Sequence, residues 1–369
     1  MIGSGIIGLS CARAAAVRGL RVIVIDRDSR ANGASVRNFG FITVTGQERG
    51  TSWVRARRTC AIWEEMAEQA GFPILQRGLW MMTRRPESVA VLEAFLKTEM
   101  GEGCEILSRD AARALCGEIV NKQVQAVLRS SVDLRVESRV AVPKIAEWLA
   151  ARRAVVFLRE SAALSVEPPR IETSCGTVSA GAAVVCPGDD MASLFPEQIA
   201  KYNVTRCKLQ MLRLEDPGFR LPAPVMSDLG LVRYAGYSAL SEAQALRARL
   251  EKEQGEYLQQ GIHLILVQSA DGSLIVGDSH HYESTPDCFS EDRVDRLILD
   301  EFTAATGRAA PDVRERWIGT YAAAPGRTMF VDAPTRSVRI VMITSGSGAS
   351  TGFAIGEEVI ADLFGGRAS

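Results

Sequence analysis

The sequence predicts an α/β protein, in which a Rossmann-like dinucleotide-binding domain is interrupted by a mainly antiparallel, strand-rich insertion. Three observations carry this prediction. The chain opens on a glycine-rich turn, Gly3–Gly8, followed by a helix and an apolar strand. It closes on a similar unit, in which the strand 338–344 leads into a glycine-rich turn at 345–352 and a helix. Between the two ends, short apolar strands and hairpin signals dominate, as expected for an inserted antiparallel sheet.

The opening turn has the form G-x-G-x-x-G, which is the dinucleotide-binding pattern when it leads into a helix. Gly3 permits a tight turn, Gly5 lets the backbone approach a pyrophosphate, and Gly8 lets the helix pack closely. Ile6 and Ile7 stand at the helix N-terminus, where free N–H groups and the positive dipole end favour phosphate.

Asp26 ends the apolar strand 22–25, about 20 residues after the turn, where a carboxylate accepts hydrogen bonds from ribose hydroxyls. An acid at this position disfavours a ribose phosphate, so FAD or NAD is expected rather than NADP. Only Met1 and Ile2 precede Gly3, although this fold normally begins with a strand of about five residues. We therefore expect the natural protein to begin upstream, and the 369-residue form to hold its nucleotide weakly.

Composition and charge argue against several classes of protein. The chain is 47% hydrophobic and 24% charged, and its net charge of -1 offers no basic surface to nucleic acid or an anionic membrane. No apolar run reaches the roughly 18 residues of a membrane span, and the N-terminus reads as the nucleotide turn rather than a signal peptide. The eight cysteines form no C-x-x-C pair, which predicts reduced thiols in a cytoplasmic protein. The three histidines show no metal-ligand spacing, so no metal is expected.

Apolar periodicity and turn residues predict the remaining elements. Residues 51–70 form an amphipathic helix with Trp63 and Met66 on its apolar side, and Pro86 stands near the start of another helix. The Asp271-Gly272 pair between two apolar runs predicts a hairpin. The predicted helices are 9–18, 51–70, 86–100, 109–116, 140–152, 242–253, 292–306 and 353–364. The predicted strands are 22–25, 78–83, 104–107, 124–129, 154–158, 163–167, 182–186, 207–214, 224–227, 262–268, 274–277, 314–321 and 338–344.

Four stretches are informative together. They are Gly3–Gly8 with Asp26, the loop 35–40 (Ser-Val-Arg-Asn-Phe-Gly), the strand and turn 183–188, and the strand and turn 340–352. In this order they resemble, over almost the whole chain, the D-amino-acid oxidase and glycine/sarcosine oxidase family of flavoproteins. The resemblance implies a Rossmann-like FAD-binding domain of glutathione-reductase type with an inserted, mainly antiparallel substrate domain. The implied FAD-binding domain comprises 1–75, 135–200 and 325–369, and the implied substrate domain comprises 76–134 and 201–324.

The same resemblance implies which residues hold the FAD. No cysteine lies near the last glycine turn and no histidine in the loop after Asp26, so the FAD is expected to be non-covalent. Ser350 and Thr351 would stabilise charge on the flavin or simply cap the last helix. The expected FAD-binding residues are Gly3, Gly5, Ile6, Ile7, Gly8, Asp26, Arg27, Ser35, Arg37, Asn38, Gly40, Val166, Pro187, Gly188, Gly346, Gly348, Ala349, Ser350, Thr351 and Gly352.

Three further strings, 37–47, 206–211 and 277–280, are similar to a subgroup of that family associated with the breakdown of phosphonates. The resemblance implies FAD-dependent oxidation of a primary or secondary amine to an imine, which then hydrolyses. The amine would be an amino acid or an aminoalkylphosphonate, N-methylated or not. The implied partners are a small anionic amine and an electron acceptor that is either O2 or unknown, and the oligomeric state is left open.

An anionic substrate needs a cation in its pocket. The candidates on or beside the inserted strands are the cations Lys208, Arg233 and Arg316 and the hydroxyl donors Tyr234 and Tyr321. His280 and His281 follow a strand end, where alternation turns one of them inward as a base or as a partner of the anion. The expected catalytic set is His281, Lys208, Tyr321 and Arg316.

Two other functions fit the same sequence. An FAD-dependent 2-hydroxy-acid dehydrogenase shares the fold, because function depends on the pocket rather than on the fold. A non-catalytic or RNA-modifying flavoprotein is the alternative from another class, although the near-neutral charge disfavours RNA. Reduction of the flavin by amines but not by hydroxy acids separates these three functions.

Overall fold

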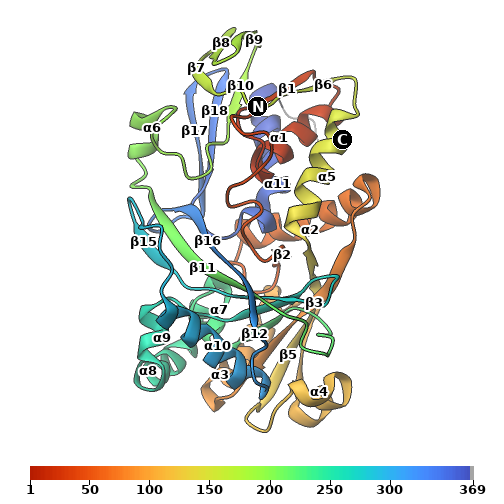
Figure 1. Cartoon of the computed structure of the whole chain (residues 1–369), viewed down its shortest axis with the longest axis vertical. Helices are drawn as coiled ribbons and strands as arrows, with labels where there is room; N and C mark the ends of the chain where they lie inside the picture. The colour runs from red at the N-terminus through yellow and green to blue at the C-terminus, as the bar shows by residue number, and fades with distance from the viewer. Residues whose placement is uncertain (366–369) are drawn as a thin grey trace.

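A parallel sheet forms the upper part of the molecule in Figure 1. The computed structural model describes residues 1–365. One edge of the sheet carries an antiparallel strand, and every other neighbouring pair runs in parallel. In order across the sheet, its members are β6 (Val155–Leu158), β1 (Val22–Ile25), the single extended residue Ile2, β10 (Ala183–Val185), β18 (Val338–Ile343) and β17 (Met329–Thr335).

The first residues of the chain fill the centre of this sheet. Ile2 forms parallel bridges to both Ile25 and Val185. The N–H of Gly3 donates to the carbonyl of Ile25 at 2.8 Å, and the carbonyl of Ile2 accepts from the N–H of Cys186 at 2.8 Å. Two residues therefore occupy the place where about five were expected, and they fix the start of the glycine turn against β1 and β10.

Helices pack closely on the parallel sheet (Figure 1). A Cβ added to Gly356 would lie 2.6 Å from the backbone of Ser10, so the last and first helices approach backbone to backbone. No helix within residues 1–365 is long and apolar enough to cross a membrane. The helices beside this sheet are α1 (Ile6–Val17), α5 (Ser138–Ala150) and α11 (Gly348–Phe364), and α2 (Thr51–Ala70) packs on α11 and α5.

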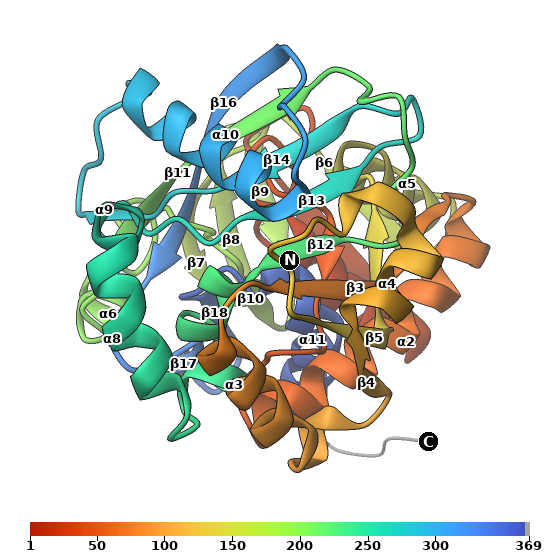
Figure 2. The same ribbon diagram turned by 90° about the horizontal axis from the view of Figure 1, so that it is seen from below.

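A ten-stranded sheet forms the lower part of the molecule, and helices surround it when it is seen from below (Figure 2). Its main path is β15 (His281–Glu283), β11 (Thr205–Leu214), β14 (Leu274–Gly277), β13 (Ile265–Gln268), β12 (Val225–Ser227), β3 (Ile74–Thr83), β5 (Ala126–Val136) and β2 (Phe41–Ile42). Off this path, β16 (Val313–Ala323) pairs with β11, and β4 (Cys104–Ser108) pairs with β5. The helices here are α3 (Pro86–Leu96), α4 (Arg109–Cys116), α7 (Ala235–Ser238), α8 (Ala243–Glu253), α9 (Gly255–Gln259) and α10 (Asp292–Thr306).

A small third sheet lies at the top of the molecule in Figure 1 and consists of antiparallel strands. Its strands are β7 (Ala163–Glu167), β8 (Arg170–Thr173) and β9 (Gly176–Ser179), and α6 (Pro196–Ala200) follows β10. The mixture of parallel and antiparallel sheets confirms the predicted α/β fold class. The division into two domains stays a prediction, and its expected boundaries at 76 and 134 fall inside β3 and β5.

Local sequence signals located most elements. Three predicted helices have the observed bounds, those at 51–70, 109–116 and 292–306. The Asp271-Gly272 pair joins β13 and β14 as an antiparallel hairpin, as predicted. The helix predicted at 353–364 begins earlier, at Gly348, because residues that looked like a loop form its first turn. Ser350 and Thr351 therefore do not cap this helix.

One buried carboxylate holds the loop 43–47 against β5. Asp133 is 2% exposed, and its Oδ1 accepts backbone N–H bonds from Val44 and Thr45 at 2.8 and 2.9 Å. Its Oδ2 accepts the hydroxyls of Thr45 and Ser130 at 2.7 and 2.5 Å. Since no other element pairs with these amides, the carboxylate fixes the loop.

Replacing Asp133 by alanine is expected to lower the free energy of unfolding by about 2–6 kcal/mol. The reason is that two backbone N–H groups lose their acceptor, and each buried unpaired group costs about 1–3 kcal/mol. Chemical denaturation of the purified protein measures this. The control is Asp110→Ala in α4, whose side chain is 85% exposed, and a loss there as large as in Asp133→Ala would contradict the explanation.

Candidate active site

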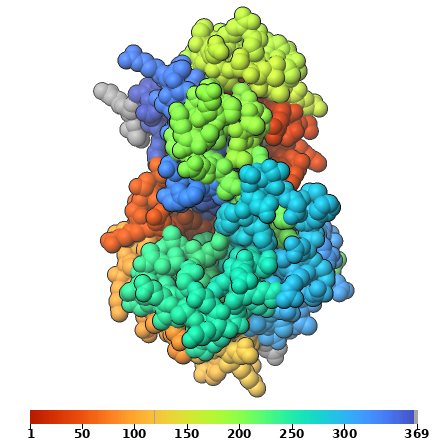
Figure 3. Space-filling model, turned by 90° about the vertical axis from the view of Figure 1, so that its left-hand side faces the viewer, coloured from red at the N-terminus to blue at the C-terminus, as the bar shows by residue number. Residues whose placement is uncertain are grey.

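A cavity of about 710 Å³ lies where the parallel sheet and the ten-stranded sheet meet, and residues from both line it. Its volume is in the range of about 300–1,000 Å³ that is usual for small-molecule sites. On the face shown in Figure 3, the green segment containing α6 lies above the teal helices α8 and α9, with blue and orange segments between them. Residues from both ends of the chain and from the inserted strands line this one cavity.

The first glycine turn forms one end of the cavity, where Gly5, Ile6, Ile7 and Gly8 line it. The N-cap of α1 makes no side-chain capping bond, and the N–H groups of Ile7 and Gly8 in its first turn point to no acceptor among the described residues, so they are available to an anion. The hydroxyl of Ser35 accepts the N–H of Ile6 at 2.9 Å. A Cβ at Gly8 would overlap the carbonyl oxygen of Gly3, so only glycine lets this turn close.

The last glycine turn faces the same cavity through Gly346, Gly348, Ala349 and Ser350. Two contacts fix the turn: Trp63 Nε1 donates to the carbonyl of Ala349 at 2.8 Å, and Ser350 Oγ accepts the N–H of Thr43 at 2.9 Å. The N-cap of α11 makes no side-chain capping bond either. A second positive helix end therefore meets the cavity.

An arginine gives the inserted-strand side of the cavity a positive charge. Arg233, Tyr282 and Tyr321 line this part of the cavity, and Arg233 Nη2 donates to the hydroxyl of Tyr282 at 2.9 Å. Burial opposes the charge on Arg233, but Tyr282, Tyr321 and Asp278 raise its pKa overall. The guanidinium is therefore a permanent cation in the cavity wall.

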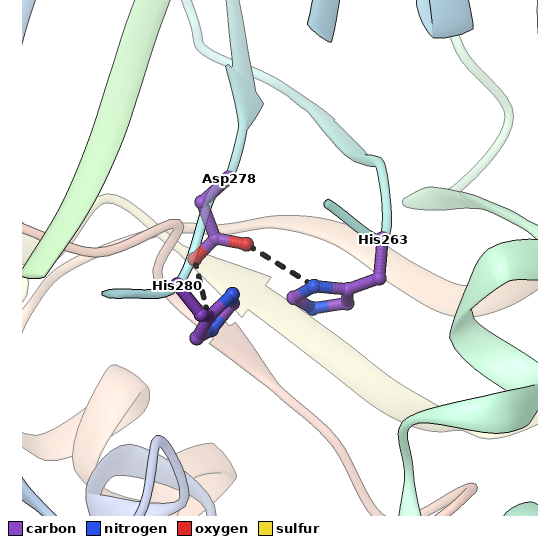
Figure 4. A group of neighbouring side chains, drawn as sticks. All are labelled: His263, Asp278 and His280. Atoms are coloured by element: carbon purple, nitrogen blue, oxygen red, sulfur yellow. Dashed lines mark ion pairs between the residues drawn. The ribbon is translucent and has the colours of Figure 1, made fainter. Parts of the chain in front are cut away.

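Three buried side chains meet beside this arginine (Figure 4). Asp278 follows β14, His280 lies two residues further on, and His263 leads into β13. Asp278 Oδ1 lies 3.4 Å from His263 Nδ1, and Asp278 Oδ2 lies 3.8 Å from His280 Nε2. All three line the cavity, although each is less than 8% exposed.

Burial controls the ionisation of this group. It raises the pKa of Asp278 to about 7, and the nearby charge of Arg233 opposes this increase. It lowers the pKa of His263 and His280 well below the ordinary value, and Arg233 adds to that effect. At neutral pH the site therefore contains two neutral imidazoles and a carboxyl group close to its midpoint.

The model of the FAD dependent oxidoreductase family (DAO) matches residues 1–363. The chain belongs to this family. FAD is therefore its cofactor. No curated protein matches the chain.

Solved structures show the same fold. Glycine oxidase from Bacillus cereus is 15% identical with a TM-score of 0.78, over 100% of this chain and 94% of that one. Iminodiacetate oxidase from Chelativorans sp. BNC1 is 16% identical with a TM-score of 0.74, over 100% and 95%. L-α-glycerophosphate oxidase from Mycoplasma pneumoniae, with FAD bound, is 14% identical with a TM-score of 0.72, over 98% and 93%.

The residues present fit FAD. Two helix N-termini without side-chain caps meet one cavity, which suits an elongated ligand with a pyrophosphate and an electron-rich ring. The expected FAD-binding residues that line the cavity are Gly5, Ile6, Ile7, Gly8, Ser35, Arg37, Asn38, Gly188, Gly346, Gly348, Ala349 and Ser350. Those that do not line it are Gly3, Asp26, Arg27, Gly40, Val166, Pro187, Thr351 and Gly352.

Several residues of the second set have other contacts. A Cβ at Gly40 would overlap the backbone of β5, and one at Gly352 would touch α1 at 3.0 Å, so both glycines serve packing. Val166 is buried in the core formed with the centre of the parallel sheet. Arg27 forms an ion pair with Asp190 at 2.8 Å. We therefore propose that these four residues support the structure around the site and do not contact FAD.

Three residues of the expected catalytic set lie outside the cavity lining. Lys208 pairs with Asp287 at 2.8 Å, and Arg316 pairs with Asp295 at 2.8 Å. His281 Nε2 lies 2.6 Å from Gln260 Oε1. Each side chain points to a partner on a neighbouring segment, so we no longer assign these three to the substrate site.

The sequence pattern missed two of the three residues that meet beside Arg233. Tyr321, from the expected catalytic set, lines the cavity, but His263 and Asp278 were not among the expected site residues. A signal for them existed: Asp278 and His280 are two residues apart after a strand, a spacing that turns both to one side. The hairpin that pairs β13 with β14 then brings His263 beside them.

A substitution at Asp26 can test how the region around the first glycine turn binds FAD. Asp26 Oδ2 accepts the N–H and the hydroxyl of Ser4 at 2.5 and 2.7 Å, and its Oδ1 accepts the N–H of Asp28 at 2.8 Å. The carboxylate therefore stands fixed at the end of β1, beside the glycine turn.

Replacing Asp26 by alanine is expected to weaken FAD binding by about 1–3 kcal/mol, roughly 5- to 150-fold, because the carboxylate is the expected acceptor of the ribose hydroxyls and also holds Ser4 of the glycine turn. Titration of the apoprotein with FAD, followed by flavin fluorescence, gives the dissociation constant. Asp28→Ala changes an exposed neighbouring carboxylate and should leave the constant unchanged. Equal affinity of Asp26→Ala and the wild type would show that Asp26 does not hold the ribose.

Proposed function

We propose that the protein oxidises a small amine that carries an anionic group, using FAD, and releases an imine that hydrolyses to a carbonyl compound. The observation that carries the proposal is the pairing of a cation with an acceptor cluster in one cavity wall: Arg233 beside Asp278, His263 and His280. When bound, FAD supplies the acceptor for a hydride from the carbon next to nitrogen. The polypeptide has to bind and orient the amine.

The anionic group of the substrate is assigned to Arg233. A guanidinium suits carboxylate and phosphonate oxygens because its N–H groups form a planar fork. The hydroxyls of Tyr282 and Tyr321, which line the cavity with Arg233, add two donors for the remaining oxygens. The amine end of the same molecule would then lie toward Asp278.

Other proteins of this fold support the amine as the reacting group. The names of two compared structures are glycine oxidase and iminodiacetate oxidase, and both named substrates join an amine to a carboxylate. The resemblance of 206–211 and 277–280 to the phosphonate-associated subgroup extends the proposed class to aminoalkylphosphonates. We therefore propose amino acids and aminoalkylphosphonates, N-methylated or not, as the substrate class.

A panel of compounds tests the reaction. The holoenzyme is mixed without oxygen with glycine, sarcosine, iminodiacetate, proline and 2-aminoethylphosphonate, and the visible absorbance of the flavin is followed. Matched hydroxy compounds, namely glycolate, lactate, glycerol 3-phosphate and 2-hydroxyethylphosphonate, serve as controls. Bleaching by one or more amines supports the proposal. Bleaching by hydroxy compounds alone would establish the 2-hydroxy-acid dehydrogenase instead, and bleaching by none would contradict both.

A substitution at Arg233 tests the anion site. Arg233→Met is expected to weaken binding of the reducing amine about 10- to 100-fold, since a charge-assisted hydrogen bond contributes about 1.5–3 kcal/mol. The measurement is the amine concentration that half-saturates flavin reduction, with FAD content as the check on folding. Arg316→Met is the matched control, because Arg316 pairs with Asp295 outside the cavity lining. A larger effect at Arg316 than at Arg233 would overturn the assignment.

A further inference from the structure

Two hydrogen-bond acceptors, His280 Nε2 and Asp278 Oδ2, face each other near Arg233, and His263 lies on the other side of the carboxylate. The Nδ1 atom of His280 donates to the carbonyl of Gly261 at 2.8 Å, so its Nε2 carries a lone pair that faces Asp278 Oδ2, 3.8 Å away. On the other side, Asp278 Oδ1 and His263 Nδ1 stand 3.4 Å apart. Neither of these two atoms has a hydrogen-bond partner among the described residues.

Such an arrangement is costly when empty. A buried polar atom left without a partner costs about 1–3 kcal/mol, so native structures rarely keep several together. All three side chains line the cavity, and a donor that enters from it can therefore reach them. A group with several N–H bonds and a positive charge matches the Asp278 carboxylate and the lone pair on His280 Nε2. The ammonium group of an amine has these properties.

We propose that Asp278, together with His263 and His280, binds the ammonium group of the substrate and accepts its proton. This inference deepens the proposed function and rests on it. An N–H bond of the ammonium breaks, an O–H bond forms on the Asp278 carboxylate, and the nitrogen keeps the electron pair. The neutral amine then has the lone pair that the C=N bond of the imine requires, which the ammonium lacks.

Burial brings the proton affinities of donor and acceptor together. It raises the pKa of Asp278 to about 7, against the opposing charge of Arg233. The same burial and the same arginine lower the pKa of an ammonium from its ordinary value of about 8–10. Proton transfer between two groups of similar pKa is the condition under which a general base works best near neutral pH.

Among the titratable side chains in this part of the cavity, Asp278 is the one whose charge changes near neutral pH. Burial and Arg233 keep His263 and His280 neutral by lowering each pKa. Burial raises the pKa of Tyr234, Tyr321 and Cys207, so these three stay protonated. The titratable or charged side chains around Asp278 are Cys207, Arg233, Tyr234, His263, His280, Tyr282 and Tyr321.

The charge of Arg233 favours a proton over a metal ion at this site. Two histidines and an aspartate whose ligand atoms lie within 4.8 Å of one another are a set that binds divalent metals in other proteins. A divalent ion would add two positive charges beside a guanidinium that already lowers the pKa of both imidazoles. An ammonium adds one charge and loses it when its proton moves to the carboxylate.

The test is the pH dependence of flavin reduction in Asp278→Asn, with the panel amine that reduces the wild type. The limiting reduction rate of the wild type should fall as pH drops through about 7, because Asp278 becomes protonated. In Asp278→Asn the rate at neutral pH should be about 10²- to 10⁴-fold lower. It should recover toward the wild-type rate as pH rises through the pKa of the bound amine, which then loses its proton without Asp278. A purely structural role would lower the rate at every pH.

A second readout does not depend on turnover. The holoenzyme reduced with dithionite can bind the amine but cannot oxidise it. Infrared difference spectra on adding the amine should show a new carboxylic-acid C=O stretch in the wild type and none in Asp278→Asn. His281→Gln is the matched control for both readouts, because His281 is the neighbouring histidine and lies outside the cavity lining. Its pH profile and its infrared band should match the wild type.

The outcomes separate this inference from the proposed function. Superimposable pH profiles for Asp278→Asn and the wild type, or no carboxylic-acid band, would overturn the inference while reduction by amines keeps the function. Reduction by no amine would overturn both. Elemental analysis adds a third arm: one metal ion per wild-type chain, retained in His281→Gln and lost in Asp278→Asn, would show a metal site and overturn the proton assignment.

Discussion

The hydrogen bonds of Ile2 and Gly3 between β1 and β10 position the nucleotide end of the active site. Parallel strands place the residues that follow them at one edge of the sheet, which is where α/β proteins bind nucleotides. Because Gly3 is held to the end of β1 and Cys186 is held to Ile2, the glycine turn, Asp26 and the turn after β10 meet at that edge. The last glycine turn joins them through β18, which is paired with β10.

At the other end of the cavity, the burial of the Asp278 carboxyl group controls its pKa. Asp278 receives no hydrogen bond at Oδ1, and its Oδ2 faces the Nε2 lone pair of His280, whose N–H donates to the carbonyl of Gly261. The nearby positive charge of Arg233 opposes the increase in the pKa of Asp278 that burial causes, so the carboxyl remains able to ionise near neutral pH. The arginine therefore has two effects: it supplies a cation for an anionic substrate and tunes the acid beside it.

Elements whose signals are local could be predicted from the sequence. The glycine turn at Gly3–Gly8 and the helix 51–70 were predicted because spacing and periodicity need no knowledge of the fold. The spacing of Asp278 and His280 is visible in the sequence, but His263 could not be added to them, because it reaches Asp278 only when the hairpin pairs β13 with β14. Lys208 was assigned to the substrate because a sequence shows a cation but not the carboxylate that neutralises it.

The central claim is that one cavity holds an anion at Arg233 and an amine at Asp278. A crystal structure of the dithionite-reduced holoenzyme with the amine that reduces it tests this most directly. We expect the anionic oxygens within hydrogen-bond distance of the Arg233 guanidinium and the amine nitrogen within hydrogen-bond distance of Asp278, below about 3.2 Å in each case. An amine bound the other way round, or bound away from both residues, would contradict it.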